Sequence, residues 1–252
     1  MAESSQVLER GSIYFFYRPR VEDEAPESLR DVQRFHMVLS PDNGEVYRLI
    51  AVGRKRMPDV ERGHERNWGF VERVTKAPED MRAILGPESY ETKTRGRRVQ
   101  PAARPAGEGV YAIVKHGNHT HLAYELELPE RPGPVQDELN VEKSGSYVVT
   151  VRNPGAPSRG QAGLARGERP NYPHELMDKF RGRRFGELDS PRFLDFEGAE
   201  IILIGADEEP GRELNVDLHA QDESEATAQI FRELRLERGH TNKRPLLRGQ
   251  WA

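Results

Sequence analysis

Hydrophobic and polar positions in the first third of the chain form short runs that predict β-strands. β-branched and aromatic residues dominate these runs, which lie at residues 11–17, 34–40, 46–52 and 68–74. The turn signal Pro41-Asp42-Asn43-Gly44 joins the second run to the third, so we expect a hairpin and antiparallel pairing. A short helix is predicted over residues 78–85, because its apolar residues share one side and Gly86 can end it.

The strand pattern returns after a segment that has almost no large apolar side chains. Residues 87–108 are rich in arginine, proline and glycine, which is typical of a basic linker or a long loop. Beyond it, one or two helical turns are expected over residues 134–139, and the strands are predicted at residues 109–115, 119–128 and 145–151. We therefore expect an N-terminal β-rich domain over residues 1–86 and a second one over residues 109–252.

The last third of the chain mixes both periodicities. Residues 173–181 have helical spacing, whereas residues 199–206 and 213–218 are typical of strands. A final helix is predicted from a cap at Asp222 to a stop at Gly239. The expected fold class is α+β, mainly antiparallel β, with two small barrel-like or sheet-rich halves and a C-terminal helix.

Composition narrows the classes of protein that fit. The wholly apolar runs, such as residues 201–204, are no longer than five residues, whereas a membrane-spanning helix needs about 20. The first ten residues lack the apolar region of a signal peptide, so a cytoplasmic location with no membrane partner is expected. The chain has no cysteine, which excludes thiol nucleophiles and cysteine-ligated metal sites. Any metal must be bound by histidine and carboxylate groups.

The charge is nearly balanced but unusual in kind. There are 38 basic and 42 acidic residues, which gives a net charge of −4, and 31 of the basic residues are arginine. Arginine suits phosphate and carboxylate partners. A GC-rich genome would produce the same excess, and a nucleic-acid footprint must be a local patch rather than a total. Both explanations stay open at this point.

The strand predicted over residues 119–128 carries candidate metal ligands. Its period of two sends Thr120, Leu122, Tyr124, Leu126 and Leu128 to the core face and His119, His121 and Glu125 to the other face. The order His-x-His-x3-Glu resembles the first metal-binding motif of cupins. That resemblance implies that His119, His121 and Glu125 bind one Zn, Fe or Mn ion, with His116 as a candidate fourth ligand. The alternative is a solvated sheet face that carries histidines.

Arginine clusters form the second set of candidates. Arg-Gly-Arg-Arg occurs at residues 95–98 and again at 181–184, and residues 53–56 form a third cluster beside a strand end. Glycine lets such a loop approach a phosphate that the arginines neutralise, while Tyr14, Phe16, Tyr17 and Trp68 could stack on bases. Ordinary solvated turns are the alternative. The candidate nucleic-acid-binding residues are Arg34, Arg54, Arg56, Arg95, Arg97, Arg98, Arg181, Arg183 and Arg184.

Residues 9–42 carry a further resemblance. An Arg-Gly precedes the first predicted strand, Arg34 begins the second, and Ser40-Pro41 ends it. This layout is similar to that of the PemK/MazF-like endoribonuclease toxins, although an acidic loop is inserted and Phe35 stands where proline is usual. The resemblance implies a small barrel that handles RNA, with Arg34 nearest a catalytic position. Residues 109–154 and 180–205 also resemble a family of uncharacterised bacterial and archaeal proteins, which implies no particular activity.

These observations favour a cytoplasmic, small-barrel binding module for RNA or another phosphate-bearing partner. The alternative is a metal-dependent enzyme with a His/Glu site on a β-strand and cupin-like chemistry. No phosphate-binding loop, serine-nucleophile elbow or metalloprotease helix is present in the sequence. The sequence leaves open whether the protein is an enzyme and how many copies assemble.

Overall fold

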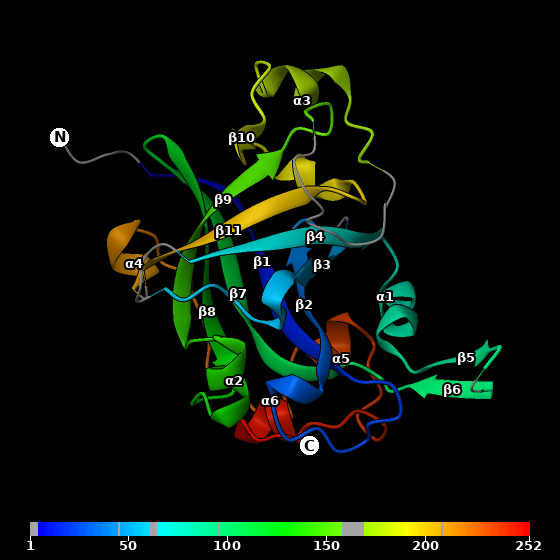
Figure 1. Ribbon diagram of the computed structural model, residues 1–252. Helices are drawn as coiled ribbons and strands as arrows, with labels where there is room; N and C mark the ends of the chain where they lie inside the picture. The colour runs from blue at the N-terminus through cyan, green and yellow to red at the C-terminus, as the bar shows by residue number, and fades with distance from the viewer. Residues whose placement is uncertain (1–4, 45, 61–64, 95, 158–168, 208) are drawn as a thin grey trace.

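The computed structural model describes residues 5–44, 46–60, 65–94, 96–157, 169–207 and 209–252, without the side chains of residues 212 and 213. Within these residues, eight antiparallel strands form a closed barrel in the order β9-β11-β4-β3-β2-β1-β7-β8 (Figure 1). Pairing between β8 and β9 closes it. The strands are β1 (Ser5–Pro19), β2 (Val32–Pro41), β3 (Tyr47–Val52), β4 (Arg66–Thr75), β7 (Arg104–His116), β8 (His119–Leu128), β9 (Ser144–Arg152) and β11 (Glu200–Asp207).

The remaining elements are short and lie around the barrel. β10 (Phe185–Glu187) pairs with the end of β9, and β5 (Glu88–Thr92) pairs with β6 (Gly96–Gln100) in a separate hairpin. The α-helices are α1 (Pro78–Leu85), α2 (Pro134–Leu139), α3 (His174–Lys179), α4 (Pro210–Glu213), α5 (Ile230–Glu233) and α6 (Arg244–Arg248). The 3-10 helices of the described residues are η1 (Leu29–Asp31), η2 (Gly53–Lys55) and η3 (Pro191–Asp195).

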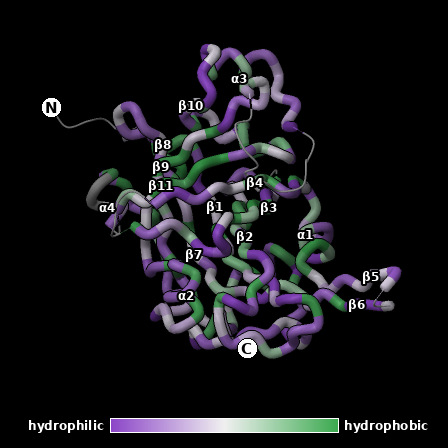
Figure 2. The backbone as a smooth tube through the Cα atoms, viewed as in Figure 1, coloured by the Kyte–Doolittle hydropathy of each residue, from purple (hydrophilic) through white to green (hydrophobic). Residues whose placement is uncertain are grey.

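The two predicted halves close one barrel instead of forming two domains. The mainly antiparallel β class is confirmed, but β1 pairs with β2 on one side and with β7, from the second half, on the other. Residues 87–108, expected to be a linker or a long loop, contain β5, β6 and the start of β7. The β5–β6 hairpin projects from the barrel and is mostly hydrophilic (Figures 1 and 2). Pairing between strands so distant in sequence has no local signal, which explains the difference.

The barrel interior is filled by alternate residues of each strand. Leu122, Tyr124 and Leu126 point into this core, as the alternation predicts, and are almost completely buried. Leu128 is buried too, but it packs on the outside, because the register between β7 and β8 shifts by one residue at Glu108. Close strand approach also requires glycine, since a Cβ on Gly109 would lie 2.1 Å from the carbonyl oxygen of Glu125.

Replacing Leu126 by alanine is expected to lower the free energy of unfolding by about 2 to 5 kcal/mol, because the side chain is buried in the main core and leaves a cavity. Denaturant titration of the two proteins measures the difference. Val7→Ala serves as the control, since Val7 is 38% exposed and its replacement should cost about 1 kcal/mol or less. Equal stabilities of the Leu126 variant and the parent would contradict the barrel packing.

A segment near the C-terminus covers part of the outer barrel surface. Residues 213–218, predicted as a strand, pair with no strand in the described part of the chain. The alternate apolar residues Leu214, Val216 and Leu218 instead pack on Ala112, Val114 and Ala123 of β7 and β8. The alternate apolar residues are therefore buried as expected, but they belong to a loop that packs on the outer face of the barrel and not to a strand.

The helix predicted over residues 222–239 is much shorter in the structure. Only α5 is helical there, because the backbone N–H of Ile230 donates to Glu108 of β7 and the carbonyl of Ala226 accepts from Arg238. These side chains take the place of the helical bond between the two backbone groups. Ile230, Phe231 and Leu234 are nonetheless buried against the outer barrel face, together with α1 and α6. In the described part of the chain, no helix has the length and apolar character that crossing a membrane requires.

Candidate functional site

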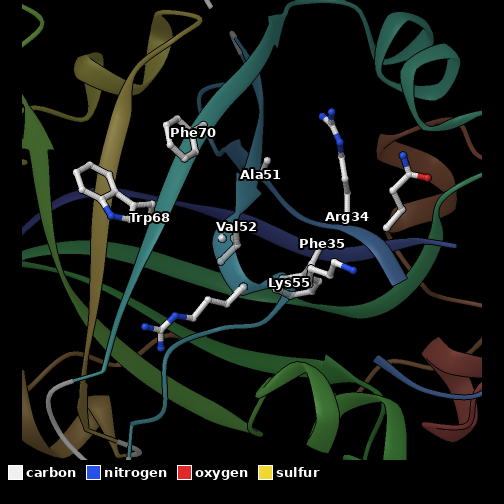
Figure 3. Close-up of a pocket in the computed structure, with 10 residues that line it drawn as sticks. Arg34, Phe35, Ala51, Val52, Lys55, Trp68 and Phe70 are labelled. Carbon is white, nitrogen blue, oxygen red and sulfur yellow. The ribbon is translucent and has the colours of Figure 1, made fainter. Parts of the chain in front are cut away.

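A pocket of about 340 Å³ opens on the outside of the barrel, over the start of β2, the end of β3 and the start of β4. We call it the Trp68 groove. Trp68 and Phe70 form one side of it, and the end of β3 with η2 forms the floor and rim (Figure 3). Its lining residues are Gln33, Arg34, Phe35, Ala51, Val52, Gly53, Arg54, Lys55, Trp68 and Phe70.

Two aromatic rings face outward from β4 because the strand alternates. Asn67 and Val71 are buried, whereas Trp68 and Phe70 are only partly buried. The Trp68 and Phe70 rings stack, with their centroids 6.3 Å apart and 22° between their planes. The ring centroid of Phe185, on β10, lies 6.0 Å from that of Trp68, with 51° between the planes. The result is a group of three partly exposed aromatic rings.

Cationic side chains surround these rings. Arg34, at the start of β2, contacts Glu72 through Nη1 and is 48% exposed. Arg54 binds Glu65 at 2.7 Å and is 63% exposed. Arg54 and Lys55 both have positive φ angles, 56° and 59°, so η2 turns sharply at the groove rim. One carboxylate contact uses few of the five N–H groups of an arginine, so each guanidinium has donors left for a second partner.

Glu72 holds Arg34 in place. The carboxylate of Glu72 also lies 3.0 Å from Nε2 of His36, which is buried on β2. Burial raises the pKa of Glu72, but the hydrogen bond and charge of His36, with the charge of Arg34, outweigh it and leave that pKa below its usual value. Glu72 is therefore ionised near neutral pH and fixes the guanidinium at the pocket edge.

The other predicted arginines are divided among several places. Arg56 shares Glu65 with Arg54, and Arg184 lies 5.4 Å above the ring of Phe185, so both flank the Trp68 groove. Arg97 and Arg98 lie on β6, far from β10 (Figure 1), and Arg98 binds Glu22. Three other candidates complete the set: Arg181 and Arg183 are exposed between α3 and β10, and Arg95 lies outside the described residues.

The stacking residues predicted from the sequence are also only partly correct. Tyr14, Phe16 and Tyr17 are completely buried and cannot stack on a base, whereas Trp68 can. Phe70 and Phe185 were not among the sequence candidates. The alternation over residues 68–74 already placed Phe70 beside Trp68, so that signal was present; the proximity of Phe185 depends on β10 and had none.

The predicted metal ligands are brought together only in part. His116, His119 and His121 share the outer face at the β7–β8 hairpin, since His116 pairs with His119 and His121 lies two residues further on β8. Glu125 lies four residues beyond His121, about 13 Å along the strand, and lines a different hollow. The expected exposed sheet face is wrong for His121, which is only 4% exposed. Burial, then the charges of His116 and His119, lowers its pKa to about 4.

A buried carboxylate cluster had no sequence signal. Oxygen atoms of Glu108, Glu127 and Glu223 lie within 4.8 Å of one another. Glu108 accepts the backbone N–H groups of Gln229 and Ile230, and Glu127 accepts that of Gln221. Burial raises the pKa of Glu108 to about 7 despite these two hydrogen bonds, and the charges of Glu127 and Glu223 add to the rise. The cluster fastens the C-terminal segment to the barrel.

Comparison of this chain with models of protein families, with curated proteins and with solved structures finds no match. The function is therefore argued from its own residues.

Proposed function

We propose that this protein is a cytoplasmic binding module for single-stranded RNA and that the Trp68 groove is its binding surface. The observation that carries the proposal is the stacked pair of Trp68 and Phe70, partly exposed and bordered by Arg34 and Arg54. Proteins that bind single strands combine aromatic rings, on which bases stack, with cations that follow the phosphate backbone. The groove offers both within one pocket.

Stacking supplies the first part of the expected affinity. The pocket of about 340 Å³ can admit a planar base against the outer faces of Trp68 and Phe70. Single-stranded rather than duplex RNA fits this geometry, because only unpaired bases can leave the helical stack and lie on an aromatic ring. Phe185 and Arg184 extend the same surface toward β10, where the next nucleotide would lie.

Phosphate contacts supply the second part. Arg34 and Arg54 stand on the groove rim with exposed guanidinium groups, and the net charge of −4 requires that any phosphate-binding region be local, as this one is. DNA carries the same phosphates and bases. We choose RNA as the ligand because a cytoplasmic location favours it. A DNA oligonucleotide of the same sequence is tested in parallel.

Replacing Trp68 by alanine is expected to weaken binding of a fluorescent oligoribonucleotide about tenfold or more, because one base loses its stacking partner. Replacing both Arg34 and Arg54 by alanine should reduce the slope of log affinity against log salt by about 0.7 for each lost phosphate contact. Fluorescence anisotropy at several salt concentrations measures both effects.

The matched control is the Arg97→Ala/Arg98→Ala protein, which removes the same number of arginines from the β5–β6 hairpin and should bind as the parent does. If this control loses as much affinity and salt slope as the Arg34/Arg54 variant, the groove is not the binding surface. Equal or tighter binding of the DNA oligonucleotide would assign the groove to single-stranded DNA and overturn the choice of RNA.

A further inference from the structure

Three imidazoles gather on the outer face of the barrel at the end of the β7–β8 hairpin. His116 and His119 are directly opposite each other, and His121 faces Val114 in the next row. Side chains two residues apart on a strand, and those paired across strands, point to the same side of the sheet. In the barrel order, β7 and β8 lie across from β3 and β4, so this cluster is remote from the Trp68 groove.

Two of the rings are already close and fixed. The ring centroids of His116 and His121 are 6.3 Å apart and their planes are perpendicular. Nδ1 of His116 lies 2.9 Å from the hydroxyl of Ser5 on β1, which holds that ring in one orientation. Imidazoles that share a metal ion must both direct a ring nitrogen at one point about 2.0 to 2.1 Å away. The present separation is close to the upper limit for two rings that share an ion, so binding requires the rings to move slightly closer together.

His121 also has an unexplained polar atom. Its side chain is almost completely buried, yet Nδ1 has no hydrogen-bond partner among the residues that the structure describes. Buried polar atoms are nearly always paired, so an exception in a native fold calls for a partner such as a water or an ion. The apolar Val114 and Val148 lie directly across from His121 on the neighbouring strands and offer it no side-chain partner.

We propose that His116 and His121 bind one divalent transition metal ion, Zn²⁺ by preference, and that His119 completes the site as a third ligand. Imidazole nitrogen is a preferred ligand of zinc, and the chain has no thiolate to compete for it. Glu125, which the cupin resemblance would have added, takes no part because it is too far along β8.

His119 needs a change of rotamer to reach the ion. In the described residues, ligand atoms from all three histidines do not lie within 4.8 Å of one another. His119 is exposed, so its ring can turn toward the other two at little cost. A bound ion would then tie β7 to β8 and, through the Ser5 contact of His116, to β1. The ion should therefore stabilise this end of the barrel.

The test is a calorimetric titration of protein without a histidine tag with ZnCl₂ near neutral pH. We expect one ion per chain, a higher melting temperature with zinc, and an affinity that falls about tenfold or more in His116→Gln and in His121→Gln. His119→Gln should lose less. Cobalt absorption bands, which report nitrogen ligation, should disappear in the His116 and His121 variants.

Controls make the outcome decisive. Glu125→Gln and His219→Gln should bind zinc as the parent does, since His219 is an exposed histidine beside Asp217 elsewhere on the surface. If the buried His121 variant fails to fold, His116→Gln alone carries the test, because that side chain is only half-buried. No stoichiometric zinc, or unchanged affinity in a folded His116→Gln protein, would overturn the proposal. RNA binding by the groove is unaffected by either result.

Discussion

Replacing Arg48 by alanine is expected to lower the free energy of unfolding by about 3 to 5 kcal/mol. Arg48 lies on β3 and its guanidinium is only 3% exposed. It donates to both carboxylate oxygens of Glu9 at 2.6 and 2.9 Å and to Asp195 of η3 at 2.8 Å, while the Tyr111 hydroxyl also donates to Glu9. Removing the cation leaves two carboxylates without their counter-charge at one end of the barrel.

The large effect reflects the groups left behind, since a buried ion pair adds little stability by itself but a single buried charge is costly. Arg48→Met should therefore be strongly destabilising although it preserves much of the side-chain volume, and adding Glu9→Gln to it should recover part of the loss. Arg73→Ala is the matched control, because Arg73 and Glu197 form a pair that is about half exposed and worth under about 1 kcal/mol. Equal losses at Arg48 and Arg73, measured by denaturant unfolding, would contradict the buried network.

Glu108 should make stability depend on pH. Its pKa is about 7 in the folded barrel and near its ordinary value of 4.5 in the unfolded chain. The folded protein therefore retains a proton that the unfolded chain releases, so this contribution is complete below about pH 4.5 and is lost as the pH rises to about 7. The difference in pKa corresponds to roughly 3 kcal/mol. Glu127, whose pKa burial also raises, acts in the same direction.

Burial of His121 acts in the opposite direction, since its pKa of about 4 makes the folded state less stable as the pH falls below about 6.5. The Glu108 contribution is therefore measured as a difference between proteins that share His121. As the pH rises from about 4.5 to about 8, the free energy of unfolding of the parent should fall by roughly 3 kcal/mol more than that of the Glu108→Gln protein.

If the stability difference between the parent and the Glu108→Gln protein does not change with pH, the pKa of Glu108 is not raised. If Glu108→Gln does not fold, Glu223→Gln provides the second variant. Removing the half-buried Glu223 charge should lower the pKa of Glu108 and stabilise the protein at alkaline pH only.

Local patterns predicted the elements that local physics controls. The helix over residues 78–85 and the strand over 119–128 both appear with those bounds, since each has a complete apolar period and a clear stop. Residues 41–44 also form the expected turn, with Gly44 at φ 65° and its N–H bonded to the carbonyl of Pro41. The alternation on β8 correctly predicted that Leu122, Tyr124 and Leu126 fill the core, but it was wrong for Leu128, which packs on the outside beyond the register shift.

What could not be predicted depends on contacts between distant residues. Glu108 accepts the backbone N–H groups of Gln229 and Ile230, which would donate to backbone carbonyls in a helix over residues 222–239. Nothing near residue 230 in the sequence indicates Glu108 as their partner. The sequence predicted some residues of the Trp68 groove but not that they lie together. Arg34, Arg54 and Trp68 were named from separate motifs, but only the order of β2, β3 and β4 in the barrel brings them to one pocket.

The most direct measurement for the central proposal is the fluorescence of Trp68 itself. The chain has two tryptophans, and Trp251 packs on Tyr17 and can be replaced by phenylalanine to leave Trp68 as the single reporter. Titration of Trp251→Phe with a single-stranded oligoribonucleotide should quench Trp68 emission to saturation, and added salt should reverse the quenching. Unchanged Trp68 emission at low salt, or quenching that persists when Arg34 and Arg54 are both replaced by alanine, would contradict RNA binding in this groove.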